Sequence, residues 1–256
     1  MRFFKRAIAV LIVIFVLPAA ASASWWAIQD RPASWREADW SASGVLPDAA
    51  TNADAAIYIL AARTGGMKGA LSVHSWIVTK KAGASGYERY DKVGWGLPVR
   101  RNAYPADARW YSNTPFVVAL VRGGEAERLI PKVEAAIAVY PFSNRGDYGL
   151  WPGPNSNSFT AHVLRSVPEL DAELPPTAVG RDYRPGIIAF DHSPDWSDIH
   201  VSLGGLAGFA AGLHTGIELQ FLGLVAGIDL LRPALKIPGF GRLELWSPAG
   251  RAAGSV

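Results

Sequence analysis

The chain begins with a short basic segment and an uninterrupted apolar run, a pattern that is not typical of the first residues of a globular domain. The basic hexapeptide MRFFKR precedes residues 7–17, which carry no charge, and small residues follow at 19–23. A short basic region, an apolar stretch of about 11 residues and an A-x-A site form the pattern of a secretory signal peptide. Ala21-Ser22-Ala23 is the expected cleavage site. We therefore expect residues 1–23 to direct export.

The same segment also fits an uncleaved membrane anchor. If Trp25, Trp26, Ala27 and Ile28 are counted, the apolar stretch reaches roughly 20 residues, which is enough to cross a bilayer. Both alternatives place the rest of the chain outside the cytoplasm, in the periplasm or anchored to the inner membrane and facing it. Membrane contact through the N-terminus is expected only if the segment is retained.

Charge and cysteine content exclude several classes of function. The sequence has no cysteine, which excludes thiolate zinc sites and cysteine nucleophiles. Three of the 25 Lys and Arg residues lie in the export segment, so the remainder has 22 basic against 22 acidic residues. A formally neutral chain offers no basic field for nucleic acid.

The hydrophobic pattern predicts an α+β fold. Alternating apolar residues predict strands at 55–62, 69–80, 87–95 and 116–121. Apolar residues at helical spacing predict a helix over 125–140, and Pro131 leaves open whether its first turn is separate. The polar run from Asn155 to Asn157 is typical of a helix N-cap, and the helix should extend to about Val167.

The remainder of the chain divides into two further parts. Residues 24–50 are predicted to form an irregular tryptophan-rich lead-in, and 51–170 the core domain. The glycine-punctuated apolar segment 171–256 is predicted to be a β-rich extension, with a meander over 199–231 and a last extended arm.

Two places carry the residues for nucleophilic chemistry. His74 lies in the predicted strand 69–80, and Ser156 follows a glycine–proline loop at the start of the second predicted helix. The N-terminus of a helix stabilises an anion through its free N–H groups and its dipole. A neighbouring histidine can take the proton of a nucleophile. Ser156 is therefore a candidate nucleophile, with His74 as its base and Asn155 or the Ser156 N–H as the oxyanion donor.

This arrangement resembles the permuted papain-like superfamily, which includes the NlpC-like, lecithin:retinol acyltransferase-like and deSUMOylating-peptidase-like families. There a strand histidine precedes a helix that opens with Asn-Cys-Asn-x-Phe, and this chain reads Asn155-Ser156-Asn157-Ser158-Phe159. Residues 55–168 match the layout. Serine replaces the cysteine, and a hydroxyl needs an orienting third group beside the imidazole. Asp91, on the next predicted strand, is the candidate for orienting His74.

The whole chain also resembles a family of Gram-negative envelope proteins without known activity. The resemblance is carried by four stretches of sequence: HSW in the His74 strand, RWYSNTP at 109–115, WPGPNSNSF around Ser156, and PALKIPGFGR near the C-terminus. It supports an envelope location and implies no reaction.

The resemblances imply two functions of different classes. The first is a Ser–His hydrolase or acyltransferase that acts on amide or ester bonds of envelope material, such as peptidoglycan peptides or acyl lipids. The second is an inactive papain-like module that binds or scaffolds an envelope ligand. In both, a groove lined by Trp76, Trp110, Trp151 and Asn157 is expected to hold the ligand.

A second polar cluster lies at 191–200, where two histidines and three aspartates fall within ten residues. Such a cluster can ligate a metal, but hydrated turns with aspartate caps have the same composition. We therefore predict no metal site. The later glycines lack a strand-to-helix phosphate motif, so no nucleotide or other cofactor is expected.

Overall fold

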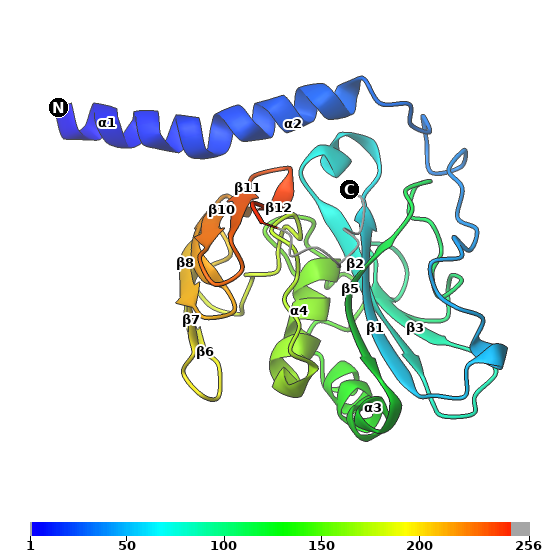
Figure 1. The fold of residues 1–256 in the computed structure, drawn as a ribbon. Helices are drawn as coiled ribbons and strands as arrows, with labels where there is room; N and C mark the ends of the chain where they lie inside the picture. Colours follow the sequence, from blue (N-terminus) through cyan, green and yellow to red (C-terminus); the bar gives the residue numbers. More distant parts are fainter. Residues whose placement is uncertain (1, 247–256) are drawn as a thin grey trace.

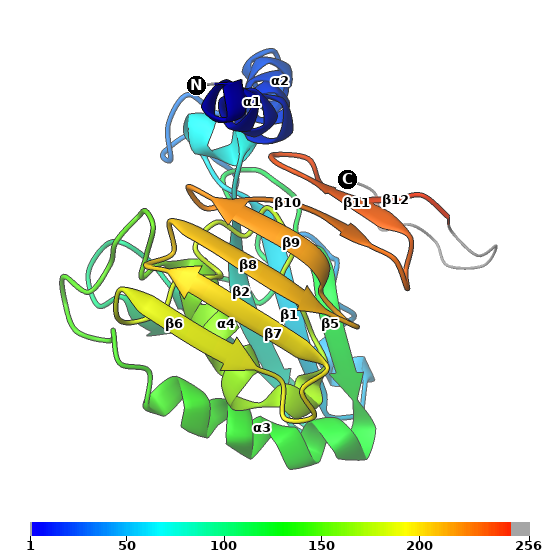
Figure 2. The same cartoon turned by 90° about the vertical axis from the view of Figure 1, so that its left-hand side faces the viewer.

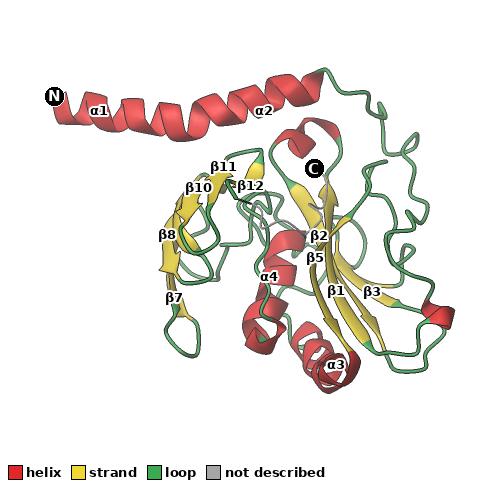
Figure 3. Ribbon diagram, viewed as in Figure 1, coloured by secondary structure: helices red, strands yellow, loops and turns green. Residues whose placement is uncertain are grey.

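The computed structural model describes residues 2–246, so the last ten residues of the predicted extension lie outside the described residues. The α+β prediction is confirmed: two antiparallel sheets and two main helices build the body of the protein (Figures 1 and 3). The five-stranded sheet has the order β4-β3-β2-β1-β5, and the seven-stranded sheet is a meander from β6 to β12. Helix α4 lies between the two sheets (Figure 1).

Short helical segments and strands alternate along the first two thirds of the chain, and strands alone follow. The helical segments are α1 Arg2–Leu11, η1 Ile12–Val16, α2 Leu17–Ala27, η2 Ala49–Thr51, η3 Gly66–Ala70, α3 Gly123–Ala138, α4 Ser156–Ser166 and η4 Pro168–Leu170. The strands are β1 Ala56–Arg63, β2 Val73–Lys80, β3 Glu88–Lys92, β4 Val99–Arg101, β5 Phe116–Arg122, β6 Ile188–His192, β7 Asp198–Leu203, β8 Ala207–Gly212, β9 Gly216–Phe221, β10 Leu224–Asp229, β11 Ala234–Ile237 and β12 Gly241–Glu244.

The N-terminal segment is one long helix formed by α1, η1 and α2. Phe4–Ala27 has a mean hydropathy of 2.5 and is long and apolar enough to cross a membrane. The predicted cleavage position after Ala23 falls inside α2. Only a few of its side chains pack on the body, and Ser22 is one of them, with its hydroxyl donating to the Ala70 carbonyl at 2.5 Å. A helix of this kind is compatible with a signal peptide or an anchor.

The five-stranded sheet confirms the four strands predicted in the core. β1 pairs with β2 and β5, and β3 extends the sheet beyond β2. β4 was not predicted, because three residues are too few to show an alternating pattern. Side chains alternate between the two faces of a strand, so His74 and Ser75 of β2 point to opposite faces of this sheet.

Each face of the five-stranded sheet is covered. On one face, α3 and α4 pack over Ile57, Ile59 and Ile77 to form the larger core cluster. Helix α3 is continuous through Pro131, so its first turn is not separate, and residues on both sides of Pro131 bury one apolar stripe. The other face packs against the tryptophan-rich lead-in, where Trp40 stacks on Tyr104.

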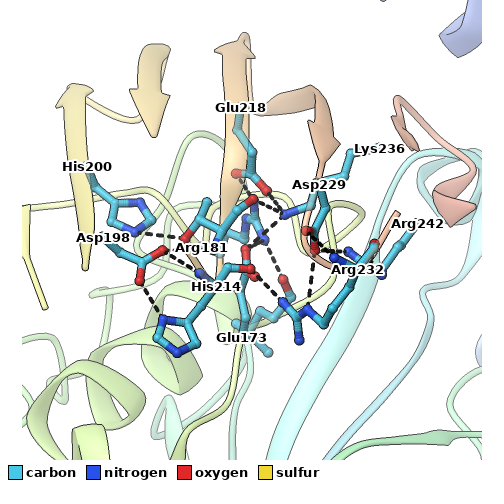
Figure 4. A network of polar contacts seen from close by, with 12 residues as sticks. Glu173, Arg181, Asp198, His200, His214, Glu218, Asp229, Arg232, Lys236 and Arg242 are labelled. Carbon is cyan, nitrogen blue, oxygen red and sulfur yellow. Dashed lines mark hydrogen bonds and ion pairs between the residues drawn. The ribbon is translucent and has the colours of Figure 1, made fainter. Parts of the chain in front are cut away.

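The seven-stranded sheet confirms the predicted meander and extends it at both ends. β6 precedes it, and the predicted final arm is the hairpin of β11 and β12. Its face toward α4 carries charged side chains rather than a hydrocarbon core (Figure 4). Glu218 is fully buried there and receives ion pairs from Arg181 and Lys236.

We expect Glu218→Ala to lower the free energy of unfolding by about 3 kcal/mol, because two buried cations lose their closest carboxylate. They retain longer ion pairs, with Glu173 at 3.3 Å from both cations and with Asp182 at 3.6 Å from Arg181. Urea unfolding of the full chain measures the change. Glu125→Ala is the matched control, since the Glu125 carboxylate is 58% exposed in its pair with Arg128 and should change stability by less than about 0.5 kcal/mol. Equal effects of the two variants would contradict a buried charge network.

Candidate functional site

A pocket of about 430 Å³ lies where both sheets meet the start of α4. Its walls come from the N-terminal end of β2, the segment after β3, the loop around Trp110, the N-terminus of α4 and the β9–β10 turn. The lining is largely apolar and aromatic, with a few polar side chains. The lining residues are Thr64, Lys68, Leu71, Ser72, Val73, His74, Lys92, Val93, Trp95, Trp110, Tyr111, Tyr148, Leu150, Trp151, Asn155, Ser156, Asn157, Val179, Leu222 and Leu224.

Ser156 is the first residue of α4 and faces this pocket. Neither its hydroxyl nor its backbone N–H has a hydrogen-bond partner among residues 2–246. A free N–H in the first helical turn, at the positive end of the helix dipole, is a site where negative charge is stabilised. The local geometry therefore leaves Ser156 available to a ligand or a substrate.

Asn155 is the N-cap of α4 and is one of the three positions, 155 to 157, that the sequence left open for this role. Its side-chain oxygen accepts from the backbone N–H groups of Asn157 and Ser158, and Ser158 completes a capping box. The Asn155 amide donates to the carbonyls of Leu150 and Val179 at 3.2 and 3.1 Å. Because both ends of this side chain are occupied, the donor left free for an oxyanion is the Ser156 N–H.

Asn157 joins the start of α4 to the strand that carries His74. Its amide donates to the carbonyls of Val73 and Val179, both at 2.9 Å, and its oxygen accepts from the Ser75 hydroxyl at 2.9 Å. Ser75 also donates to Thr160 at 3.0 Å. Although Asn157 was predicted to contact a ligand, its polar atoms are used to position the two neighbouring residues, His74 and Ser156.

His74 lies in the same pocket but is not hydrogen-bonded to Ser156. Its ring stacks on Trp110 with 3.7 Å between centroids and 4° between planes, and its Nε2 is buried without a partner. Burial lowers the pKa of His74 well below its ordinary value, and the nearby Arg89 lowers it further. The imidazole is therefore neutral at pH 7 but a weaker base than an exposed histidine, and nothing in the described chain orients it toward Ser156.

Asp91 does not orient His74. Its Oδ2 accepts from Arg89 Nε at 2.6 Å, and both side chains are almost completely buried on the aromatic face of the sheet. The Arg89 guanidinium lies 4.2 Å from the centre of the Trp76 ring and donates to the Pro105 carbonyl. Burial raises the pKa of Asp91 even though Arg89 counteracts it. The third member proposed for a Ser–His–Asp arrangement is therefore committed to an ion pair.

The predicted tryptophan groove is only partly present. Trp110 and Trp151 line the pocket, and Trp151 donates its Nε1 hydrogen to the Leu222 carbonyl at 3.0 Å. Trp76 lies outside the pocket, because it is fully buried and its Nε1 donates to the Ala106 carbonyl. Trp76 is two residues after His74 in β2, so the two side chains lie on the same face of the sheet, but Trp76 is covered by the segment around Ala106.

Sequence reasoning missed the pocket residues contributed by loops and by the second sheet. Trp95 and Tyr148 come from loops whose course no periodicity predicts, and Leu222 and Leu224 come from the β9–β10 turn. Lys92 was also missed: its ammonium donates to the carbonyls of Phe142 and Asp147, and burial lowers its pKa to about 8. An isolated lysine in a strand gives no sequence signal of such a role.

The polar cluster at 191–200 forms turns and ion pairs. Asp198 accepts hydrogen bonds from the backbone of Thr215, from Ser197 and from His214, whose Nδ1 lies at 2.6 Å. Although burial opposes them, these bonds lower the pKa of Asp198 to about 2. Among residues 2–246, no group of three or more acidic or histidine side chains is placed to hold a metal ion.

The buried His74 should make stability depend on pH. Since its pKa is lower in the folded than in the unfolded chain, the unfolded state binds the proton first as pH falls below about 6.5. The contribution of neutral His74 to the free energy of unfolding is therefore fully present above that pH. Below it, the free energy of unfolding falls by at most about 1.4 kcal/mol per pH unit for this one group.

Urea unfolding at pH 7.5 and 5.0 measures this loss. His74→Phe keeps a ring against Trp110 and removes the titrating group, so we expect a smaller loss in this variant than in the wild type. The half-buried His162 and His200 contribute equally to both proteins, because partial burial lowers their pKa values too. An unchanged loss in His74→Phe would contradict the burial of a neutral His74.

Comparison with known proteins assigns a family without an activity. Residues 54–183, just over half of the chain, match a family model described as a protein of unknown function (DUF3750). The matched range contains His74, Asp91 and Ser156 and ends before the second sheet. Neither the curated proteins nor the solved structures contain a significant match. The chain therefore belongs to the DUF3750 family of proteins of unknown function.

Proposed function

We propose that this protein is an exported envelope module that binds an apolar ligand, in particular the acyl chain of a lipid, in the pocket beside Ser156. The observation that carries the proposal is the lining: Trp95, Trp110, Tyr148, Leu150 and Trp151 surround the few polar groups. Ligand pockets of a few hundred Å³ are usually apolar, with a small number of polar groups that fix orientation. A peptide would leave its backbone groups unpaired against such walls.

Polar groups at the pocket rim suit the head of such a ligand. Lys68, in η3, is among the lining residues, and its ammonium has no partner among the described residues. Together with the free Ser156 N–H, it offers donors to a carboxylate or ester oxygen. A fatty acid or an acyl lipid satisfies both the walls and the rim.

We expect a fluorescent fatty acid to bind the purified full chain and Leu150→Glu to abolish binding, because a carboxylate in the apolar wall loses its hydration. Fluorescence titration measures the affinity. Leu97→Glu is the matched control, since Leu97 is 63% and Leu150 56% exposed but only Leu150 lines the pocket. Equal binding by the two variants would contradict the assignment of the pocket.

A second candidate is a Ser–His hydrolase or acyltransferase built on a permuted papain-like core. It is favoured by the position of Ser156 at the start of α4, with a free hydroxyl and a neutral His74 in the same pocket. Catalytic hydrogen bonds often tighten only when substrate binds. Against it stands the pairing of Asp91 with Arg89, which leaves the imidazole without an orienting carboxylate.

A fluorophosphonate probe separates the two candidates. If the protein only binds its ligand, the wild type remains unlabelled, and Ser156→Ala binds the fluorescent fatty acid as the wild type does. Labelling of the wild type that is lost in both Ser156→Ala and His74→Ala would establish the hydrolase instead. In-gel fluorescence of the folded, full-length variants is the measurement, with Ser143→Ala as a control serine outside the pocket.

A further inference from the structure

In the seven-stranded sheet the polar face is buried and the apolar face is exposed, the reverse of the usual arrangement in a soluble two-layer fold. Residues directly opposite one another in neighbouring strands share a face, so the registers divide its side chains into two sets. The inner set, toward α4, contains Asp198, Glu218, Asp229 and Lys236, which are buried. A sheet that packs on a core normally buries its apolar side and exposes its polar side.

The outer set of this sheet is apolar. From β7 to β11 every outward side chain is a hydrocarbon or a phenyl ring, and β12 adds Leu243. The residues of this outer face are Ile199, Val201, Leu203, Ala207, Phe209, Ala211, Ile217, Leu219, Phe221, Leu224, Ala226, Ile228, Leu235 and Ile237.

Much of this outer face is open to solvent in the isolated chain. Leu203, Ile217 and Leu219 are each between 45 and 48% exposed, and Leu219 lies in the middle of β9, a central strand of the sheet. On β6, Phe190 continues the surface at 54% exposed. A contiguous apolar surface over several strands marks an interaction site, because single exposed apolar residues are normal but such a group is not.

The N-terminal helix lies against one edge of this outer face. Phe15 is buried and its ring lies 5.7 Å from that of Phe221, an outer-face residue of β9. Figure 2 looks along the helix axis and directly onto the outer face, with β1, β2 and α4 behind the sheet. The helix therefore projects from the body on the same side as the outer face and roughly perpendicular to it (Figures 1 and 2).

We propose that the outer face of the seven-stranded sheet is a lipid-contact surface that lies on the membrane into which the N-terminal helix inserts. Lipid is favoured over a protein partner because the outward side chains from β7 to β11 include no charge or hydrogen-bonding group to specify one. Trp196 and Trp246, 62 and 76% exposed in the segments beside β7 and β12, add the aromatic residues typical of a membrane interface.

The length of the helix defines how this contact forms. Phe4–Ala27 is about 36 Å long, but only about 16 Å of it extends beyond Phe15, against the roughly 30 Å of hydrocarbon in a bilayer. A spanning helix must therefore withdraw Phe15 from the sheet, and cleavage of the segment would remove Phe15 altogether. Withdrawal uncovers Phe221 at the surface of the membrane that the helix spans, where acyl chains replace the phenyl ring.

Single-cysteine reporters test the proposal, since the chain has no native cysteine. Leu219→Cys places an environment-sensitive nitrobenzoxadiazole label on the outer face. Ala50→Cys places it in η2, the short blue helical turn on the far side of the five-stranded sheet from the seven-stranded sheet (Figure 1). The full-length protein is reconstituted in phosphatidylcholine vesicles with or without brominated acyl chains. We expect blue-shifted emission that the brominated lipid quenches at position 219, and aqueous, unquenched emission at position 50.

Two outcomes would overturn the proposal. Aqueous, unquenched emission at both positions would show that the outer face remains in water although the helix is inserted. A blue shift at position 219 that brominated lipid leaves unquenched and that disappears on dilution of the protein among lipids would assign the face to a second copy of the chain. Since Leu219 is 48% exposed, its replacement should not prevent folding, which circular dichroism of each labelled variant verifies.

Discussion

The side chain of Asn157 is the contact on which the arrangement of the molecule depends. It holds β2 through the Val73 carbonyl and the Ser75 hydroxyl, and it holds the segment that leads to the second sheet through the Val179 carbonyl. A backbone hydrogen bond from Val73 to Thr177 reinforces the same junction. Because these groups are buried, each would be costly to leave unpaired. The Asn157 amide thus fixes the positions of the start of α4, the start of β2 and the segment that leads to β6.

This junction explains which parts of the site could be predicted from sequence. The α+β class, the strands and the cap at Asn155 follow from local rules, because period-two and helical patterns and Asx capping act within a few residues. The sequence also places His74 and Ser156 in elements that pack together. It does not reveal that Asp91 pairs with Arg89, two residues away on the same strand. Which of several possible partners a carboxylate takes depends on distances that only the folded structure shows.

Tertiary context also decided the details that sequence reasoning missed. Trp76 and His74 share a face, but only His74 reaches the pocket, since Trp76 is covered by the segment around Ala106. Alternation correctly predicted strands in the second half of the chain. It could not say which face is buried, and the usual assumption that apolar residues point inward fails for this sheet. That failure is itself informative, because departures from local rules tend to coincide with functional surfaces.

The pocket and the outer face meet at one structural element, the β9–β10 hairpin. Leu222 and Leu224 of this hairpin line the pocket. Leu224 also belongs to the outer face, as does its cross-strand partner Phe221, which packs on Phe15. The Leu222 carbonyl accepts from Trp151, so the hairpin is also fixed to the loop before α4. A sheet that lies on lipid would bring one wall of the proposed acyl pocket to the membrane surface. An acyl chain would then pass from the bilayer to the Ser156 pocket over the turn of the β9–β10 hairpin.

The inverted polarity of the second sheet has an energetic consequence for the whole chain. Glu218, Arg181 and Lys236 lose their hydration when the sheet packs on α4, and their mutual attraction at best offsets this cost. The attachment of this sheet to the body therefore gains little from hydrophobic burial, which ordinarily contributes most to the stability of a folded protein. The apolar side chains of this sheet, whose burial would supply that stabilisation, face outward. If the outer face lies on a membrane as proposed, lipid would cover this apolar area, and the contact would add the hydrophobic stabilisation that the inner face lacks.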